Sequence, residues 1–240
     1  MRACGCCILF AVFLYSPHSL ADDNSGNEGK NVWSYGVTAG LGYFNFRDSL
    51  YVDREPDPSG DLGDDWAEFY VKPWLEYEQS MGGNVIFAKG SWAYVRTDDD
   101  AAEIGGGAAD SADFDDLYVG IRRGSTETGL IELAGGRLPY EMAHGFLLSD
   151  GNADGGSRGG YWSNPRTAWA PAARFRYANK NNALDIFYLE RDERPESNAE
   201  TKIAGINYEW RSAGDKWTLA VSILSYAQTI SGPTSMVPGS

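Results

Sequence analysis

The chain is short of cysteine, of positive charge and of long apolar runs, and each shortage excludes a class of protein. Its 3 cysteines are Cys4, Cys6 and Cys7, so the chain beyond them can build neither a disulfide scaffold nor a thiolate metal site. The net charge of −14 and the lack of a basic stripe argue against a nucleic-acid partner. Beyond residue 21, no apolar run reaches the length of about 18 residues that a membrane-spanning helix requires.

Residues 1–21 have the features of a secretory signal peptide. Arg2 supplies the positive start, residues 8–15 form a short apolar core, and residues 19–21 precede an expected cleavage before Asp22. Cleavage would also remove all the cysteines, which would leave a mature chain without thiols.

The rest of the chain is dominated by segments in which apolar and polar residues alternate. Successive side chains of a β-strand point to opposite faces, so this alternation predicts strands with one apolar wall and one polar wall. In the first of them, aromatic residues stand at both ends of the apolar wall with aliphatic residues between, which is typical of a strand that crosses lipid. Nine such strands are predicted, at residues 33–43, 67–77, 85–96, 116–122, 130–138, 169–177, 184–188, 202–210 and 217–223.

Two positions predict irregular strand pairing, and the face of a third residue follows from the alternation. Pro73 lacks a backbone donor, so we expect a bulge or a weakly paired point there. The pair Gly135-Gly136 predicts a second bulge, which leaves the face of Arg137 open. The alternation places Trp169 on the outward, apolar wall.

The connections between these strands alternate strictly between long acidic loops and short turns. Outer-membrane barrels have this asymmetry, because their periplasmic turns are short and their external loops are long. The long loops are expected at residues 47–65, 98–112, 139–168 and 191–200, and the short turns at residues 78–84, 124–129, 179–182 and 211–215.

These features together predict an all-β fold, an antiparallel transmembrane β-barrel of the outer-membrane type. Nine strands are an odd number, so we expect residues 33–240 to be the incomplete, N-terminal part of a larger barrel, preceded by a periplasmic segment at 22–32. A complete small barrel with one strand miscounted remains an alternative. A secreted sandwich is disfavoured, because its inner faces would carry charges such as Glu68 and Arg174 and would have no dry core.

A structureless loop as long as the third one (residues 139–168) is uncommon unless it is functional or disordered, and its apolar residues predict that it packs by folding into the lumen. Three segments in and beside it are distinctive: Gly-Arg-Leu-Pro-Tyr at 136–140, His-Gly-Phe-Leu-Leu-Ser-Asp-Gly at 144–151 and Gly-Gly-Ser-Arg-Gly-Gly-Tyr-Trp at 155–162. Through them the sequence resembles the alginate-export family of Gram-negative outer-membrane porins, best over residues 135–177. The resemblance implies a large monomeric barrel and passage of an anionic oligo- or polysaccharide through an arginine-lined lumen.

Arginines on or beside the inward walls are the candidate pore-lining, anion-binding residues. A ring of guanidinium groups attracts anions through its summed field and releases them because each contact is weak. In the alternative interpretation, the same arginines only neutralise inward carboxylates such as Glu132 and Asp185. The candidates are Arg122, Arg174 and Arg176 on the strands, and Arg137, Arg158 and Arg166 around the third loop.

Asp150, Asn152 and Asp154 match the beginning of a calcium-binding loop. The position that should supply the bidentate carboxylate is Tyr161, so a turn cluster is the simpler interpretation. We therefore expect no cofactor, with a partial Ca²⁺ site at this external loop as the exception to test.

The sequence thus predicts a porin or channel of the Gram-negative outer membrane, in contact with lipid, that passes anionic saccharides or other small anions. The first alternative is a surface binding or adhesion protein on a barrel anchor. The second is a barrel enzyme using His144, Ser149 and Asp150, but no nucleophile turn accompanies these residues and we expect no enzyme activity.

Overall fold

The computed structural model describes residues 8–10, 20–21, 31–47, 63–98, 109–142, 145, 147–212 and 217–229. Within these residues the protein is all-β: its 11 strands form a single antiparallel sheet, and the only helical pieces are the 3₁₀ turns η1 (Gly156–Arg158) and η2 (Pro195–Ser197). None of the described helical segments has the length and apolarity needed to cross a membrane.

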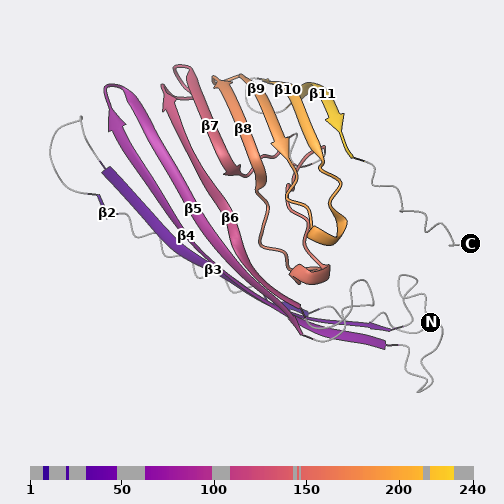
Figure 1. Ribbon diagram of the computed structural model, residues 1–240. Coiled ribbons are helices and arrows are strands. Elements are labelled where there is room, and N and C mark those ends of the chain that lie inside the picture. Colours follow the sequence, from indigo (N-terminus) through magenta and orange to yellow (C-terminus); the bar gives the residue numbers. More distant parts are fainter. Residues whose placement is uncertain are drawn as a thin grey trace, which may run out of the picture.

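Nine of the strands stand side by side in chain order, from the indigo to the yellow edge of the sheet (Figure 1). They confirm the nine predicted strands, with somewhat longer bounds. They are β3 (Asn31–Arg47), β4 (Gly63–Met81), β5 (Asn84–Asp98), β6 (Ala109–Arg123), β7 (Leu130–Leu138), β8 (Trp169–Ala178), β9 (Asn182–Glu190), β10 (Lys202–Arg211) and β11 (Thr218–Ala227).

The two shortest strands, β1 (Ile8–Phe10) and β2 (Leu20–Ala21), pair with the free edge of β3 and belong to the predicted signal peptide. Among the described residues no pairing joins β11 to β3, so the sheet does not close on itself (Figure 1).

Strand length divides the sheet into two parts. Strands β3–β6 have 15 to 19 residues, whereas β7–β11 have 9 or 10. At about 3.3 Å per residue, the shorter strands have the length that a tilted strand needs to cross a bilayer. The longer strands therefore project beyond them, and the third loop lies beside this projection (Figure 1).

The two faces of the sheet differ in the way the alternation predicted. The outward face exposes large apolar side chains, such as Val119 at 57%, Leu133 at 55% and Ile206 at 45%. The inward face, which the third loop covers, holds the charged residues and a cluster of buried apolar ones. That cluster comprises Phe87, Ala134, Leu138, Tyr140, Met142, Trp169, Ala172, Phe187, Leu189 and Ile203.

Small residues on β3 make room for aromatic rings on β4. A Cβ atom at Gly36 would lie 2.7 Å from the Trp74 ring, and one at Gly40 would lie 2.2 Å from the Tyr70 ring. These glycines therefore let the two aromatic side chains lie across the inward face of the neighbouring strand.

The expected irregularities are present, and one assignment of a face is wrong. The pairing of β4 with β5 stops at Val71 and resumes at Trp74, which confirms the weak point at Pro73. The register of β7 with β8 shifts between Gly136 and Leu138, which confirms the second bulge.

Trp169 was predicted to face outward, but only 3% of it is exposed, and it lies in the inward cluster. The bulge is the physical reason, because it pairs Leu138 with Trp169 out of phase with the rest of the strand. The Trp169 indole then donates a hydrogen bond to the backbone carbonyl of Tyr140 at 3.1 Å.

Candidate functional site

The third loop is held against the inward face by buried carboxylates of the wall, and the first of these is Glu68 of β4. Its carboxylate accepts hydrogen bonds from the backbone N–H groups of Trp162 and Ser163, at 3.1 and 2.7 Å. It also accepts the Ser163 hydroxyl at 2.6 Å and the Trp66 indole N–H at 2.9 Å. Glu68 is 0% exposed, so these donors replace the water that the carboxylate would otherwise require.

The second anchor is Asp115 of β6, which is also 0% exposed. It accepts the backbone N–H groups of Thr167 and Ala168, both at 2.9 Å, and forms an ion pair with Lys72 of β4. The Lys72 ammonium in turn donates to the carbonyl of Pro165 at 3.0 Å. Wall and loop thus share one network, which fixes the last part of the loop before β8 begins.

Two glycines allow the loop to approach the long strands closely. Gly159 and Gly160 have φ angles of 65° and 68°, a region that favours glycine. A Cβ at Gly159 would lie 2.8 Å from the carbonyl oxygen of Ala109, and one at Gly160 would lie 2.7 Å from Val95. The Gly160 N–H donates to the Thr97 hydroxyl at 2.8 Å, so the backbone itself is the contact surface.

All six arginines predicted to bind anions lie within ion-pair distance of a carboxylate. This geometry supports the alternative interpretation, in which they neutralise acidic residues of the lumen, and anion binding by them stays a prediction. The pairs are Arg122–Glu78 at 2.7 Å, Arg174–Glu132, Arg176–Asp185 at 3.8 Å, Arg137–Asp192, Arg158–Asp192 at 3.1 Å and Arg166–Asp154.

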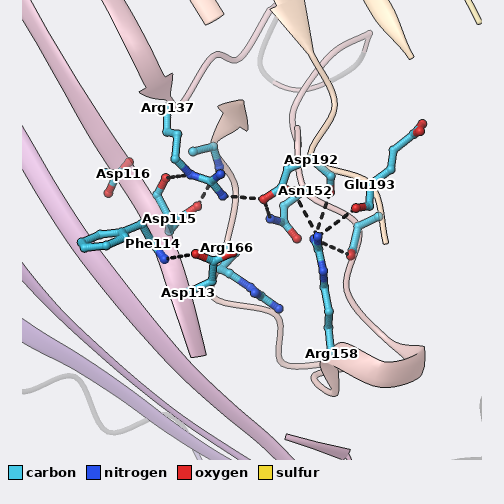
Figure 2. Close-up of polar contacts among 12 residues, drawn as sticks. Asp113, Phe114, Asp115, Asp116, Arg137, Asn152, Arg158, Arg166, Asp192 and Glu193 are labelled. Atoms are coloured by element: carbon cyan, nitrogen blue, oxygen red, sulfur yellow. Dashed lines mark hydrogen bonds and ion pairs between the residues drawn. The ribbon is translucent and has the colours of Figure 1, made fainter. Parts of the chain in front are cut away.

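Asp192 connects the third loop to the fourth loop (residues 191–201). Its carboxylate receives Arg137 from the end of β7, Arg158 from η1 and the side-chain amide of Asn152 at 3.0 Å (Figure 2). Arg158 also donates to the backbone carbonyl of Glu193 at 2.8 Å. One aspartate of the fourth loop therefore binds three donors, one at the end of β7 and two in the third loop, which joins the two loops into one body.

Among the ion pairs of the described residues, Arg166–Asp154 is the most deeply buried, since the two side chains are 1% and 2% exposed. Arg166 also donates to the Ser111 hydroxyl of β6 at 3.2 Å. Burial raises the pKa of Asp154 to about 7, although the positive charge and the hydrogen bond of Arg166 act in the opposite direction.

The three residues of the calcium-like pattern are engaged in other contacts. Asp154 pairs with Arg166, Asn152 binds Asp192, and Asp150 accepts the backbone N–H of Asn152 at 2.8 Å. In the part of the chain that the structure describes, no group of three or more metal-ligating side chains lies together. His144 lies outside the described residues, as do residues 48–62 and 99–108 of the first two acidic loops.

A polar cavity of about 290 Å³ opens on the inward face near the short turns. Its lining contains three carboxylates and three cationic side chains, and Tyr118 and Phe87 add aromatic surface. The charged residues are Glu76, Glu78, Lys89, Arg122, Glu132 and Arg174. Such a lining can hydrogen-bond hydroxyl groups and water from many directions at once.

Sequence reasoning missed the two anchors and two further arginines. Glu68 was predicted only as an inward residue, and Asp115 lay just outside the strand predicted at 116–122, because their loop partners are 52 to 95 positions away. Arg191 and Arg194 of the fourth loop line a second cavity, and within the described residues neither forms an ion pair. Their separation by Asp192 and Glu193 concealed them in a run of mixed charge.

No protein-family model, curated protein or solved structure matches this chain. The chemistry of the site must therefore be argued from its own groups. Paired charges, hydroxyl groups and a folded loop on one face can bind and orient polar solutes.

Proposed function

We propose that this chain forms part of the wall of a monomeric β-barrel channel in the outer membrane of a Gram-negative bacterium. The observation that carries the proposal is the inverted distribution of side chains over the sheet. Apolar residues are exposed along the outward faces of the strands, while Glu68, Asp115 and Asp116 are buried on the inward face. A lipid-facing exterior and a polar lumen account for this inversion.

The proposed solutes are polar, with anionic saccharides as the substrate class implied by the resemblance to alginate-export porins. The third loop supports a channel with a narrowed lumen, because it lies on the inward face and is fixed by charge-assisted hydrogen bonds. The arginine–carboxylate pairs offer both donors and acceptors, as a hydroxyl-rich solute requires. They also predict a modest preference for anions, since each guanidinium group has a nearby countercharge.

Single-channel recording tests this function directly. The full-length protein would be reconstituted in planar bilayers, and its conductance and reversal potential measured in a salt gradient. We expect discrete conductance steps with weak anion selectivity, and partial block of the current by an oligouronate. Absence of conductance combined with tight binding of a ligand would favour the adhesion protein on a barrel anchor.

A further inference from the structure

A second cavity, of about 440 Å³, lies between the third and fourth loops. Its lining is mostly polar and comes from both loops, which the Asp192 network joins into one body (Figure 2). Both loops belong to the set predicted to face the cell exterior, so the cavity lies at the outer end of the proposed lumen. The lining residues that matter here are Asn152, Asp154, Arg191, Glu193 and Arg194.

The two cationic groups of this cavity differ from the six arginines that were predicted to bind anions. Each of those six has a carboxylate within 4 Å, whereas in the described chain Arg191 and Arg194 form no ion pair. Arg191 is exposed and Arg194 is half-buried. The charge of Arg191 acts on Asp150, which lines the same cavity, so Arg194 is the guanidinium group without a described carboxylate partner. Its planar fork of donors matches a carboxylate, which favours an anionic ligand.

The third polar group is a buried acceptor without a donor. Asn152 is only 2% exposed, and its amide nitrogen is taken by Asp192. Its Oδ1 atom has no hydrogen-bond partner among the described residues. Buried acceptors in proteins are normally satisfied, so a donor such as a ligand hydroxyl would complete this group.

The acidic side chains that line the same cavity have partners of their own. Asp154 pairs with Arg166, and Glu193 accepts the backbone N–H of Ala199 and the hydroxyl of Thr201. Asp150 accepts the backbone N–H of Asn152 and interacts electrostatically with Arg191. These carboxylates are therefore directed to groups of the protein and leave Arg194 to the cavity.

We propose that this cavity is a binding subsite for a small hydroxylated carboxylate of the acidic-sugar class. Arg191 and Arg194 bind the carboxylate, and a ligand hydroxyl donates to Asn152 Oδ1. The proposal deepens the proposed channel function and rests on it for the route by which the solute arrives. Equilibrium binding at the subsite can nevertheless be measured without conduction.

The test is isothermal titration of the full-length protein in detergent micelles with sodium D-glucuronate, and with D-glucose and sodium acetate as partial ligands. We expect glucuronate to bind at least about tenfold more tightly than either partial ligand, because only glucuronate engages both kinds of group. Arg194→Gln should weaken glucuronate binding by about 10- to 100-fold, the loss expected for a charge-assisted hydrogen bond. Arg123→Gln is the matched control and should leave binding unchanged. Arg123 is also an exposed arginine, but it lies at the end of β6 beside the short turn, away from the cavity.

Three results would overturn the subsite. The first is equal glucuronate affinity in the wild type and in Arg194→Gln. The second is a wild type that conducts ions but binds no glucuronate, which removes the subsite and keeps the channel. The third is binding of CaCl₂ alone that Asp150→Asn abolishes, which would assign the cavity to a cation. Glucuronate binding by a protein that does not conduct would keep the subsite and remove the channel instead.

Discussion

The outward and inward faces of the same strand differ in opposite ways from those of a water-soluble protein, since the apolar side chains are exposed and the charged ones are buried. On β6, the outward Leu117, Val119 and Ile121 are exposed to 44–57%, whereas the inward Asp115 and Asp116 are buried to within 3% of complete coverage. In a water-soluble protein the apolar face would be covered and the charged face exposed. The inversion teaches that burial on the inward face depends on ion pairs and loop hydrogen bonds, while the outward face has the apolar surface that the proposed contact with lipid would require.

The inward face is itself divided by the third loop. Near the short turns, Arg122 and Glu78 remain 34% and 42% exposed, so water screens their interaction. Under the loop, Arg166 and Asp154 are almost fully covered, so each depends on the other for its charge to be tolerated. Loss of one partner should therefore lower the free energy of unfolding much less for Arg122–Glu78 near the short turns than for Arg166–Asp154 under the loop.

The largest effect is expected from breaking the covered pair. Arg166→Met leaves Asp154 buried without its partner, and loss of one member of a buried pair typically costs about 3–5 kcal/mol. We expect the third loop to open and its cleavage by chymotrypsin at Tyr161 and Trp162 to accelerate at least about a hundredfold.

The double variant Arg166→Met/Asp154→Leu is the control for this prediction. It removes both charges, so its cleavage rate should return close to that of the wild type. Equal rates in the single variant and the wild type would show that the pair does not hold the loop.

A smaller effect should separate the two faces within one strand. Val37 and Thr38 are neighbours on β3 at nearly the same depth, but Val37 points outward and Thr38 inward. Val37→Arg places a charge in the apolar band, at a cost of about 2–4 kcal/mol near the bilayer midplane. In Thr38→Arg the new side chain points to the lumen and lies beside Lys72. The positive charge of Lys72 is offset by Asp115 and Asp116, so a further positive charge is tolerated there.

The measurement is the free energy of unfolding in lipid vesicles, followed by tryptophan fluorescence in urea. We expect destabilisation for Val37→Arg and a change of less than about 1 kcal/mol for Thr38→Arg. Similar losses for both variants would contradict the assignment of the outward face to lipid.

The strands and their faces could be predicted because they depend on a local period of two residues. The bulge at Gly136 was predictable for the same reason, since adjacent glycines in a strand are a local signal. The inward orientation of Trp169 could not be predicted, because it depends on the pairing of Trp169 with Leu138 across a loop of about thirty residues.

The partners of the charged residues could not be predicted from the sequence. Lys72 meets Asp115 across 43 positions, and Glu68 meets Ser163 across 95. Such contacts depend on the path of the third loop, which period-two patterns do not specify. For this reason the choice between anion binding and neutralisation at Arg122, Arg174 and Arg176 could not be made from the sequence.

The smallest effect on stability concerns these three strand arginines, which remain partly exposed beside Glu78, Glu132 and Asp185. Arg122→Gln removes a screened ion pair, so the free energy of unfolding should change by less than about 1 kcal/mol. Arg174→Gln and Arg176→Gln leave buried carboxylates and should cost more than that, but less than Arg166→Met, because Arg174 and Arg176 are themselves partly exposed. The selectivity of the channel should change more clearly than its stability, because each replacement leaves an inward carboxylate without its countercharge. We therefore expect the reversal potential in a salt gradient to move toward that of a cation-selective pore in every variant. The shift should be larger for Arg174→Gln than for Arg122→Gln, since the side chain of Glu132 is less exposed than that of Glu78 and its field is screened less by water. An unchanged reversal potential in all three variants would place the selectivity of the channel elsewhere, and Arg191 and Arg194 between the third and fourth loops would be the next residues to replace.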